Sequence, residues 1–365
     1  LRYESAQIGP AVGAMRRAQG LVEGRLSAIG LAARRQIAAE SWAREAVATA
    51  EIEGERLDLD AVRCSVCRRL GVEGAKVSRV PRNVEGLLDV MENAADRAAE
   101  PLTDARLQAW QQALFPTGFS GLNPVRVNAY RARREPMRIV SGPVGRERIH
   151  YEAPPSRTVP AEMRRFLKWF NEGREPDLLV RAALAHLWFE TIHPFEDGNG
   201  RVGRAIVDLA LVRDVGDTGR VVRISQQLSN QRDAYYAELQ RAQHGSLDVT
   251  PWVAWFVSQV REACETAAGV VDLALAKARF WTAHSDQDLN ARQRKVLKAL
   301  LDAGPGGFEG AMNTRKYEAM TATSRATSSR ELIELARLGF LAVVGGGRST
   351  RYYINLDGWT PSGPS

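Results

Sequence analysis

The chain contains only three cysteines among its 365 residues, and aromatic residues make up 7% of it. So few cysteines do not support a disulfide framework, and the pair Cys64 and Cys67 lacks the further Cys or His ligands that a zinc site needs. No run of about eighteen uncharged apolar residues occurs, and the first residues do not resemble a signal peptide. These absences predict a cytoplasmic protein with no membrane segment.

Length and charge set wide limits. The chain is long enough for two or three domains, each with a core of its own. Its formal net charge of +7 and sequence pI of about 9.5 permit an acidic partner such as nucleic acid without establishing one. Most segments show helical periodicity and few turn signals, which predicts a mainly α protein.

The densest polar stretch is HPFEDGNGRVGR, residues 193–204. The mostly apolar run Leu178–Ile192 before it predicts a buried helix that stops ahead of Pro194, because proline disfavours helix at the preceding residue. Apolar residues return at helical spacing from Val202 to Ala210, so a second helix should begin near Arg201. The glycine-rich turn therefore lies at a helix N-terminus, where unpaired backbone N–H groups bind phosphate.

The side chains of this stretch suit work on a nucleotide. Asp197 is a hard oxygen ligand for a Mg²⁺ ion that bridges phosphates. Arg201 and Arg204 share a helix face and could hold phosphate oxygens. His193 has the one nearby side chain whose unperturbed pKa suits proton transfer at neutral pH. A Walker loop is excluded because no Lys-Ser/Thr follows the glycines. The remaining alternative is a polar turn punctuated by glycine.

The string matches every position of HPFx(D/E)GNGRxxR, and it resembles the signature of the Fic family. The resemblance implies a Fic-type helical core and nucleotidyl transfer, usually AMPylation, in which a target hydroxyl attacks the alpha-phosphate of ATP. By this resemblance His193 is the general base and Asp197 binds Mg²⁺. The resemblance also implies an anion hole at Gly198, Asn199 and Gly200, with Arg201 on the beta-phosphate and Arg204 on the gamma-phosphate. The related Doc branch, a kinase, carries Lys where this chain has Arg201.

A second motif lies far upstream. Thr49, Glu53 and Gly54 stand in TAEIEG, in which Thr49 and Glu53 are four apart on one helix face and Gly54 can end the helix. Taken alone this is an ordinary helix end. Beside the first motif it resembles the (S/T)xxxE(G/N) inhibitory motif of class II Fic proteins. The resemblance implies that Glu53 pairs with Arg204 and occupies the gamma-phosphate position.

Two further segments are interpreted through the same resemblance. MRIVSGPVGRERIHY, residues 137–151, predicts a β-hairpin around Gly142, Pro143 and Gly145. Fic proteins carry such a hairpin, the flap, which aligns the target by strand pairing, here through Ile139, Val140 and Ser141. A plain surface hairpin is the alternative.

Tyr235 and Tyr236 fall in the region that walls the adenine pocket of Fic proteins. Adjacent residues on a helix point roughly 100° apart, so only one of the two can face the site. Packing in the core is the alternative to stacking on the base.

Residues 289–356 predict three helices followed by a hairpin, the order of a winged helix-turn-helix, which the sequence resembles. Eleven Lys and Arg residues oppose five Asp and Glu residues, giving a local charge of +6. Such a unit binds DNA or docks a protein.

The expected domains are an N-terminal helical domain (1–78), the Fic core (79–262), a connecting helix (263–288) and the winged helix (289–357). We expect a protein adenylyltransferase that uses ATP and Mg²⁺ and is inhibited in cis by Glu53. Its expected partner is a protein target with a Ser, Thr or Tyr hydroxyl, which the chain itself could supply. DNA binding through residues 289–357 and a homodimer also stay open. The alternatives are removal of AMP from a target, with water positioned by Glu53, and a DNA-binding regulator that senses nucleotide.

Overall fold

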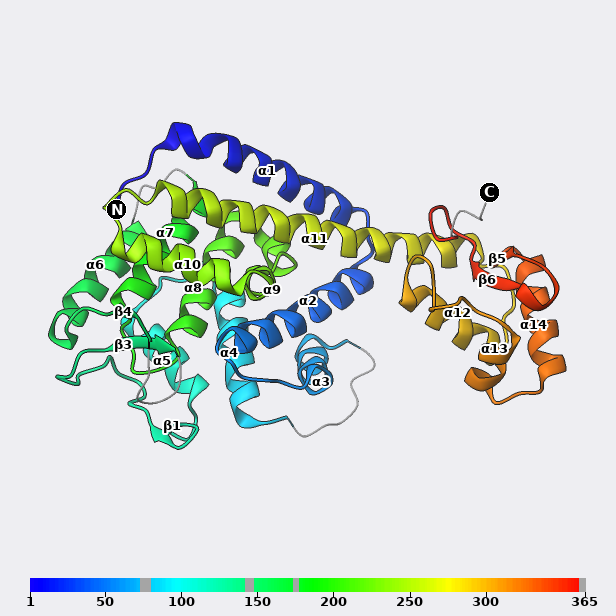
Figure 1. The fold of residues 1–365 in the computed structure, drawn as a ribbon, viewed down its shortest axis with the longest axis horizontal. Coiled ribbons are helices and arrows are strands. Elements are labelled where there is room, and N and C mark those ends of the chain that lie inside the picture. Colours follow the sequence, from blue (N-terminus) through cyan, green and yellow to red (C-terminus); the bar gives the residue numbers. More distant parts are fainter. Residues whose placement is uncertain (73–79, 142–147, 173–176, 361–365) are drawn as a thin grey trace. The chain divides into compact units, whose positions relative to one another are not determined.

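The structure is a computed structural model of the chain, and it describes residues 1–72, 80–141, 148–172 and 177–360. The chain divides into two compact units, Leu1–Val271 and Asp272–Ser365. The described residues are mainly helical and carry two-stranded antiparallel sheets (Figure 1). This confirms the predicted mainly α fold with small hairpins. The finer division into four segments stays a prediction.

The N-terminal part of the first unit is helical, as predicted. Its helices are α1 (Ser5–Ser27), α2 (Leu31–Ile52), α3 (Leu59–Leu70), α4 (Arg82–Asp96) and α5 (Asp104–Leu114). The helix α2 matters most for the site, because most of its second half is buried and it ends at Ile52. Gly54 follows with a φ of +82°, a left-handed conformation that glycine adopts without strain. The chain can therefore turn sharply directly after Glu53.

The middle of the first unit is built on α7 (Leu178–Ile192) and α8 (Asn199–Val215), which pack closely against each other. The helix α7 ends where Pro194 predicted, and α8 begins at Asn199, two residues before the predicted start. An unbroken run of α8 residues from Arg201 to Leu211 is buried. Helices α6 (Val159–Glu172), α9 (Ile224–Asn230), α10 (Arg232–His244) and α11 (Thr250–Ala283) complete the helical set of this region.

Short strands lie between α5 and α6. One pair is β1 (Phe119–Ser120) with β2 (Asn123–Pro124), and the other is β3 (Arg138–Ser141) with β4 (Arg148–Glu152). In the second pair Val140 is opposite Ile149, and the register shifts between Ile139 and Val140. The two strands of the predicted flap therefore pair as expected. The predicted turn at Gly142, Pro143 and Gly145 lies outside the described residues.

The second unit has the predicted order of three helices and a hairpin. Its elements are α12 (Ala291–Ala303), α13 (Thr314–Thr321), α14 (Arg325–Arg337), β5 (Leu341–Val344) and β6 (Arg351–Ile354). The 3-10 turn η3 (Gly347–Ser349) lies between β5 and β6, and the turns η1 (Ser156–Thr158) and η2 (Gly216–Arg220) belong to the first unit. Apolar side chains of α12, α14 and the hairpin form one core with Phe280 and Tyr317.

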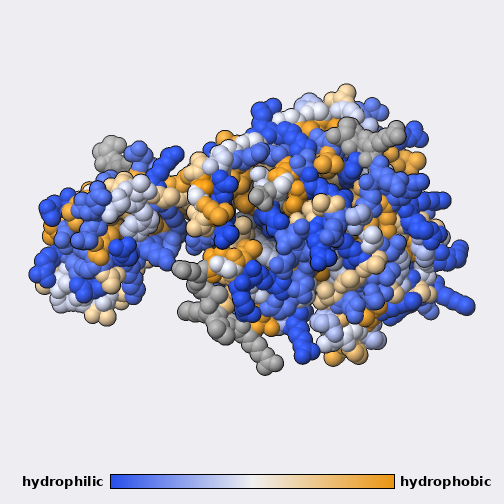
Figure 2. Space-filling view, turned by 180° about the vertical axis from the view of Figure 1, so that it is seen from behind, coloured by the Kyte–Doolittle hydropathy of each residue, from blue (hydrophilic) through white to orange (hydrophobic). Residues whose placement is uncertain are grey.

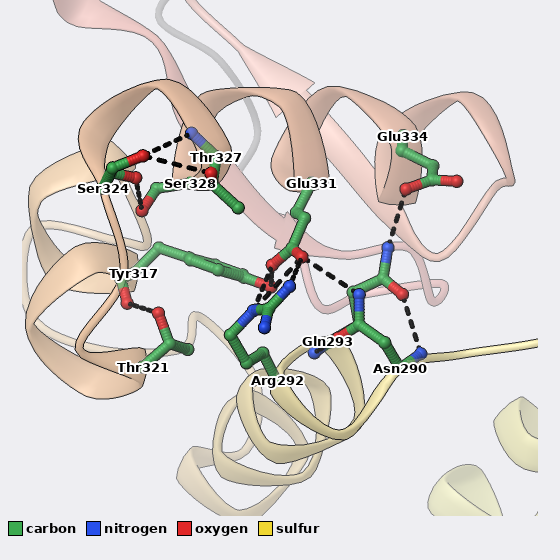
Figure 3. A network of polar contacts seen from close by, with 10 residues as sticks. All are labelled: Asn290, Arg292, Gln293, Tyr317, Thr321, Ser324, Thr327, Ser328, Glu331 and Glu334. Atoms are coloured by element: carbon green, nitrogen blue, oxygen red, sulfur yellow. Dashed lines mark hydrogen bonds and ion pairs between the residues drawn. The ribbon is translucent and has the colours of Figure 1, made fainter.

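A polar network ties the helices of the second unit together (Figure 3). The carboxylate of Glu331 on α14 accepts hydrogen bonds from Arg292 Nη2 at 2.5 Å, from Tyr317 Oη at 2.6 Å and from Asn290 Nδ2 at 3.0 Å. Asn290 also caps α12 in a capping box with Gln293. Because Glu331 takes donors from α13 and from the start of α12, the angle between these helices is fixed by hydrogen bonds as well as by apolar packing.

Hydrophilic residues are spread over the face of the molecule in Figure 2, with smaller hydrophobic patches between them. In the part of the chain that the structure describes, no helix is both long and apolar enough to cross a membrane.

Candidate active site

The loop between α7 and α8 is held by its own side chains. His193 caps the end of α7 with a φ of +49°, an unusual value for a residue with a Cβ. Phe195 is fully buried. The Asn199 side chain accepts from the Phe195 N–H and donates to the Phe195 carbonyl, both at 2.9 Å. The Asn199 amide therefore clamps the loop, so only its backbone N–H could serve the anion hole implied by the resemblance.

Arg131 braces the same loop from outside. This residue lies in a stretch without a periodic pattern, so no local signal marks it in the sequence. It is 5% exposed, and its guanidinium donates to the carbonyls of His193 at 2.7 Å and Ile192 at 3.2 Å. Its backbone N–H donates to the Pro194 carbonyl at 2.9 Å. These bonds stabilise the strained backbone at His193 and fix where the imidazole lies.

The glycines of the motif leave room at the start of α8. Gly198 has a φ of +87°, and its N–H donates to Asp197 Oδ1 at 2.6 Å. The N–H groups of the first turn, from Asn199 onward, have no partner within the helix. A Cβ on Gly200 would lie 2.1 Å from Glu53 Oε1. The carboxylate of Glu53 therefore occupies the place beside the helix N-terminus where an anion is favoured.

Arg204 connects the two predicted motifs. Its side chain is 2% exposed, and its Nη2 donates to Glu53 Oε1 at 2.7 Å. The same guanidinium donates to Thr49 twice, from Nε to Oγ1 at 2.6 Å and from Nη2 to the carbonyl at 3.0 Å. The structure thus brings together three residues that the sequence singled out from segments about 150 positions apart. Thr49 would still hold Arg204 if Glu53 were to leave.

Arg201 is also engaged by a carboxylate. Its Nη1 donates to Glu55 Oε1 at 2.8 Å, and its guanidinium lies over the Phe115 ring at 5.0 Å. Asp197 Oδ1 is 3.8 Å from Arg201 Nη2. The sequence interpretation missed Glu55, which stands one residue past Gly54 and belongs to no helical stripe. Both motif arginines therefore have carboxylate partners that come from the segment following α2.

The pKa shifts of His193 and Glu53 place a neutral imidazole near a carboxylate anion. Burial lowers the pKa of His193 to about 4, although the backbone of Glu190 and the charges of Glu53 and Asp197 act in the opposite direction. The imidazole is therefore neutral at pH 7. Burial would raise the pKa of Glu53, but the Arg204 guanidinium outweighs it and the pKa falls below its ordinary value. Glu53 is thus an anion at neutral pH.

Asp197, the residue predicted to bind Mg²⁺, has no other metal-ligand cluster beside it in the described residues. Asp197 keeps 40% of its side chain exposed, and the described residues hold no cluster of three or more His, Cys, Asp or Glu side chains suited to a metal. Mg²⁺ often takes one carboxylate together with phosphate oxygens and water. The donor set therefore fits an ion that arrives with a nucleotide, rather than one bound by the protein alone.

Tyr235 and Tyr236 point in different directions, as adjacent residues on a helix must. Tyr235 is 1% exposed, and its ring stacks on His186 and on Trp255. Its hydroxyl lies 2.8 Å from His186 Nε2. Tyr236 is 38% exposed, and its hydroxyl donates to the Ile52 carbonyl at 3.2 Å. The structure therefore places Tyr235 in the core and Tyr236 beside the end of α2.

The predicted flap strand β3 pairs with β4, and β4 is hydrogen-bonded to the end of α7 next to His193. Tyr151 of β4 donates from its hydroxyl to the Thr191 carbonyl at 2.9 Å, two residues before His193. Ile139 is half-buried and pairs with Tyr151. Val140 and Ser141 continue the strand. Whether a target pairs with these residues stays a prediction.

Comparison with known proteins gives the same family over part of the chain. Residues 101–211 match the model of the Fic/DOC family, and residues 1–72 match that of a domain of unknown function, DUF4172. The chain therefore contains a Fic/DOC family domain. The first match covers the motif, and the second covers Glu53.

The curated relatives are named as protein adenylyltransferases. A probable protein adenylyltransferase of Aquifex aeolicus is 30% identical over 99 residues, covering 27% of this chain and 28% of that protein. Protein adenylyltransferase Fic of Nematostella vectensis is 30% identical over 142 residues, covering 36% and 31%. The chain thus matches less than a third of the length of these relatives.

Solved structures share the fold. A Fic family protein from Desulfovibrio desulfuricans G20 superposes with a TM-score of 0.56 at 21% identity, covering 98% of each chain. A Fic domain containing protein from Bacteroides thetaiotaomicron gives 0.52 at 16% identity, covering 71% of this chain and 98% of that one.

Proposed function

We propose that this protein transfers AMP from ATP to a hydroxyl group of a protein target and that the transfer is inhibited in cis. The observation that carries the proposal is the Glu53 carboxylate, which lies against Gly200 at the start of α8 and pairs with the buried Arg204. A site that holds a carboxylate between a helix N-terminus and a guanidinium can hold a phosphate in its place. The names of the curated relatives support the same reaction.

Each motif residue then has a role. The N–H groups at the start of α8 and the guanidiniums of Arg201 and Arg204 bind the phosphates of ATP. His193 takes the proton of the target hydroxyl while its oxygen bonds to the alpha-phosphorus and the bond to pyrophosphate breaks. Asp197 would hold Mg²⁺ together with phosphate oxygens, and that ion offsets the charge of the triphosphate.

Inhibition follows from competition for the two arginines. Glu53 holds Arg204, and Glu55 holds Arg201. A triphosphate must displace both carboxylates before it can use both guanidiniums. Tyr236 donates to the last residue of α2 and so helps to hold this segment in place. The bound nucleotide therefore lacks its full set of contacts while Glu53 stays.

The experiment uses ATP labelled on the alpha-phosphate. The Glu53→Gly protein is incubated with labelled ATP, GTP, UTP or CTP in cell extract, and the modified peptide is identified. We expect transfer by Glu53→Gly and none by Glu53→Gly, His193→Ala. Labelling that persists without His193, or the absence of labelling with every nucleotide, would contradict the proposal.

Hydrolytic removal of AMP is the second candidate, because Glu53 lies next to the anion site and could position water. Incubating an AMPylated target with the wild-type protein separates the two. Release of AMP that needs Glu53 would favour hydrolysis, whereas an unchanged target favours transfer.

We further propose that the second unit recruits a partner, either DNA or protein, as a winged helix does. Arg325 and Arg330 on α14 are exposed. Ser328 at the start of the same helix is buried, and Arg292 is paired with Glu331, so neither side chain is free for such a contact. Binding of the full chain to random duplex DNA at two salt concentrations tests the DNA alternative.

A further inference from the structure

A buried carboxyl group lies behind the base. Glu190 on α7 is 5% exposed, and its Oε2 is 3.7 Å from His193 Nδ1. The motif assigns no role to this residue, and the proposed phosphate site does not use it. Burying a carboxyl group without a strong partner is unfavourable, so its presence calls for an explanation.

Three buried polar atoms that make no hydrogen bond of good geometry in the described part of the chain meet at this place, although the backbones of Gly203 and Glu190 lie near His186 and His193. They are His186 Nδ1, Glu190 Oε1 and His193 Nδ1, which come from one helix and its cap at spacings of four and three residues. The neighbouring helix makes room for them at Gly203. A Cβ at that position would lie 2.4 Å from Glu190 Oε1 and 3.3 Å from His186 Nδ1. The space beside Nδ1 is thus polar and bounded.

The orientation of the base depends on what Nδ1 meets. Nδ1 of His193 is buried, while the side chain keeps 14% of its surface exposed. The exposed surface therefore belongs to side-chain atoms other than Nδ1, and of the two ring nitrogens only Nε2 can contribute to it. A neutral imidazole has one protonated nitrogen, so Nε2 can accept a proton only when Nδ1 holds the hydrogen. Whatever group faces Nδ1 thus decides whether the base is competent.

We propose that Glu190 is a positioning residue for His193, and that its carboxyl group determines which ring nitrogen carries the proton. When the carboxyl group is ionised it accepts from Nδ1–H, directly or through one bridging water, and Nε2 is free to take the target's proton. When it is protonated it donates to Nδ1, and the hydrogen on Nε2 prevents base catalysis. The inference rests on the proposed function, because it assigns the proton of that reaction.

The electrostatic surroundings agree with such a switch. Burial and the nearby Glu53 charge raise the pKa of Glu190 to about 8, although Arg204 acts in the opposite direction. Charged or titratable groups face this carboxyl group from α7, α8, α10 and the end of α2: His186, His193, Arg204, Tyr235 and Glu53. Removal of Glu53 takes away the negative charge that favours protonation. Release of inhibition would then also make the base more competent.

The test compares Glu53→Gly with Glu53→Gly, Glu190→Gln at saturating ATP. We expect the second protein to lose about tenfold or more in kcat, with the KM for ATP within twofold, because the carboxyl group does not reach the nucleotide side of the ring. We also expect the rate of Glu53→Gly to rise with pH through a midpoint at or below about 8, and this rise to vanish in the Gln variant. Equal rates and equal pH profiles would overturn the inference.

A matched control is Asp208→Asn in the same background. Asp208 is a carboxyl group on α8 that is 4% exposed, has an unpartnered Oδ1 in the described part of the chain, and faces Arg223 at 3.8 Å instead of the base. Burial also raises its pKa, to about 7. We expect its replacement to leave kcat and the pH profile unchanged. A loss equal to that of Glu190→Gln would mean that any buried carboxyl group has this effect, and the inference would fail.

A second measurement does not need the Glu190 variant to fold. In Glu53→Gly protein with ¹⁵N-labelled histidine, the His193 signal is assigned by its absence from a His193→Ala sample. Above about pH 5, where the imidazole is neutral, and below the midpoint of Glu190 we expect the hydrogen on Nε2, and above that midpoint we expect it on Nδ1. The Glu190 backbone carbonyl is a competing acceptor near the ring. If it holds the hydrogen on Nδ1 at every pH, the tautomer does not change and the inference is wrong.

If Glu53→Gly transfers no nucleotide at all, the proposed function fails and the kinetic comparison does not arise. The tautomer measurement still decides whether Glu190 controls His193. The two failures are therefore distinguishable.

Discussion

Two arginine–carboxylate pairs, one in each unit, differ in how many partners the carboxylate has. Glu331 is 6% exposed at its side chain and accepts from Arg292, Tyr317 and Asn290. Glu53 is 30% exposed, and in the described residues it accepts one hydrogen bond, from Arg204. The pair of Glu331 with Arg292 therefore stabilises the second unit, whereas a ligand anion needs to replace one hydrogen bond to displace Glu53 from Arg204.

The two arginines also differ in whether residues other than the carboxylate hold them. Arg204 keeps two bonds to Thr49 whether or not Glu53 is present, so it stays in place for another anion. Arg292 is exposed, and the bonds that the structure records for its guanidinium all go to Glu331. A buried arginine that is also held by Thr49 and pairs with a partly exposed carboxylate is thus suited to exchange of that carboxylate for another anion. An exposed arginine on a buried carboxylate is suited to a structural role.

The largest expected effect is that of Glu53→Gly. Loss of one charge-assisted hydrogen bond frees Arg204, and we expect self-labelling from labelled ATP to rise by about tenfold or more. The matched control is Glu51→Gly, because Glu51 is an exposed glutamate on the last turn of the same helix. Equal labelling by the Glu53→Gly and wild-type proteins would refute inhibition in cis.

Glu331→Gln should act on stability alone. The change leaves the Arg292 and Tyr317 donors with a weaker acceptor, and we expect a loss of about 1 to 3 kcal/mol in the free energy of unfolding of the second unit. Urea denaturation with hydrogen exchange of α13 and α14 measures it, and labelling in the Glu53→Gly background should not change. A change in labelling without a change in stability would remove the contrast between the pairs.

Glu55→Gln should have a smaller effect than Glu53→Gly. Glu55 is 38% exposed, and pairs of this kind are worth roughly 1 kcal/mol or less. We therefore expect the KM for ATP to fall by at most about fivefold in the Glu53→Gly background, with kcat unchanged. An unchanged KM would mean that Glu55 does not compete with the nucleotide.

The smallest effect is expected from a change of pH between 5 and 8 in the wild-type protein, in which Glu53 still holds Arg204. Burial acts to raise the pKa of Glu53, but Arg204 lowers it overall, whereas the hydrogen bond from Arg292 is the main cause of the lowered pKa of Glu331. A lowered pKa means that the stabilisation is present above the unfolded pKa and is lost as pH falls through the folded pKa. Both pairs should persist across this range, so wild-type labelling stays low. Activation of the wild type at pH 5 to 6 would contradict this assignment.

Much of the fold and of the site could be predicted because local signals agree with the tertiary structure. Pro194 ends α7, and glycines at 198 and 200 give the backbone conformation and the space that the site needs. The pairing of Glu53 with Arg204 was expected from the family resemblance, and the two residues lie at 2.7 Å.

Other parts carried no local signal. Helix spacing separates Tyr235 from Tyr236 but does not say which one packs on His186. The Arg131 guanidinium donates to the backbone of a distant loop, and no hydrophobic periodicity in the sequence marks a residue with that role. Glu190 stands within an apolar helix, where one glutamate does not reveal that it faces the base. These contacts depend on packing between segments that are distant in sequence.

The central claim is that the Glu53 carboxylate stands where a phosphate binds, and calorimetric binding of ATP and ADP tests it most directly. In the wild type Arg204 is occupied, so the two nucleotides should bind with similar Kd. In Glu53→Gly the gamma-phosphate gains Arg204, and ATP should bind at least about fivefold more tightly than ADP. The same ratio of affinities in both proteins would contradict the account.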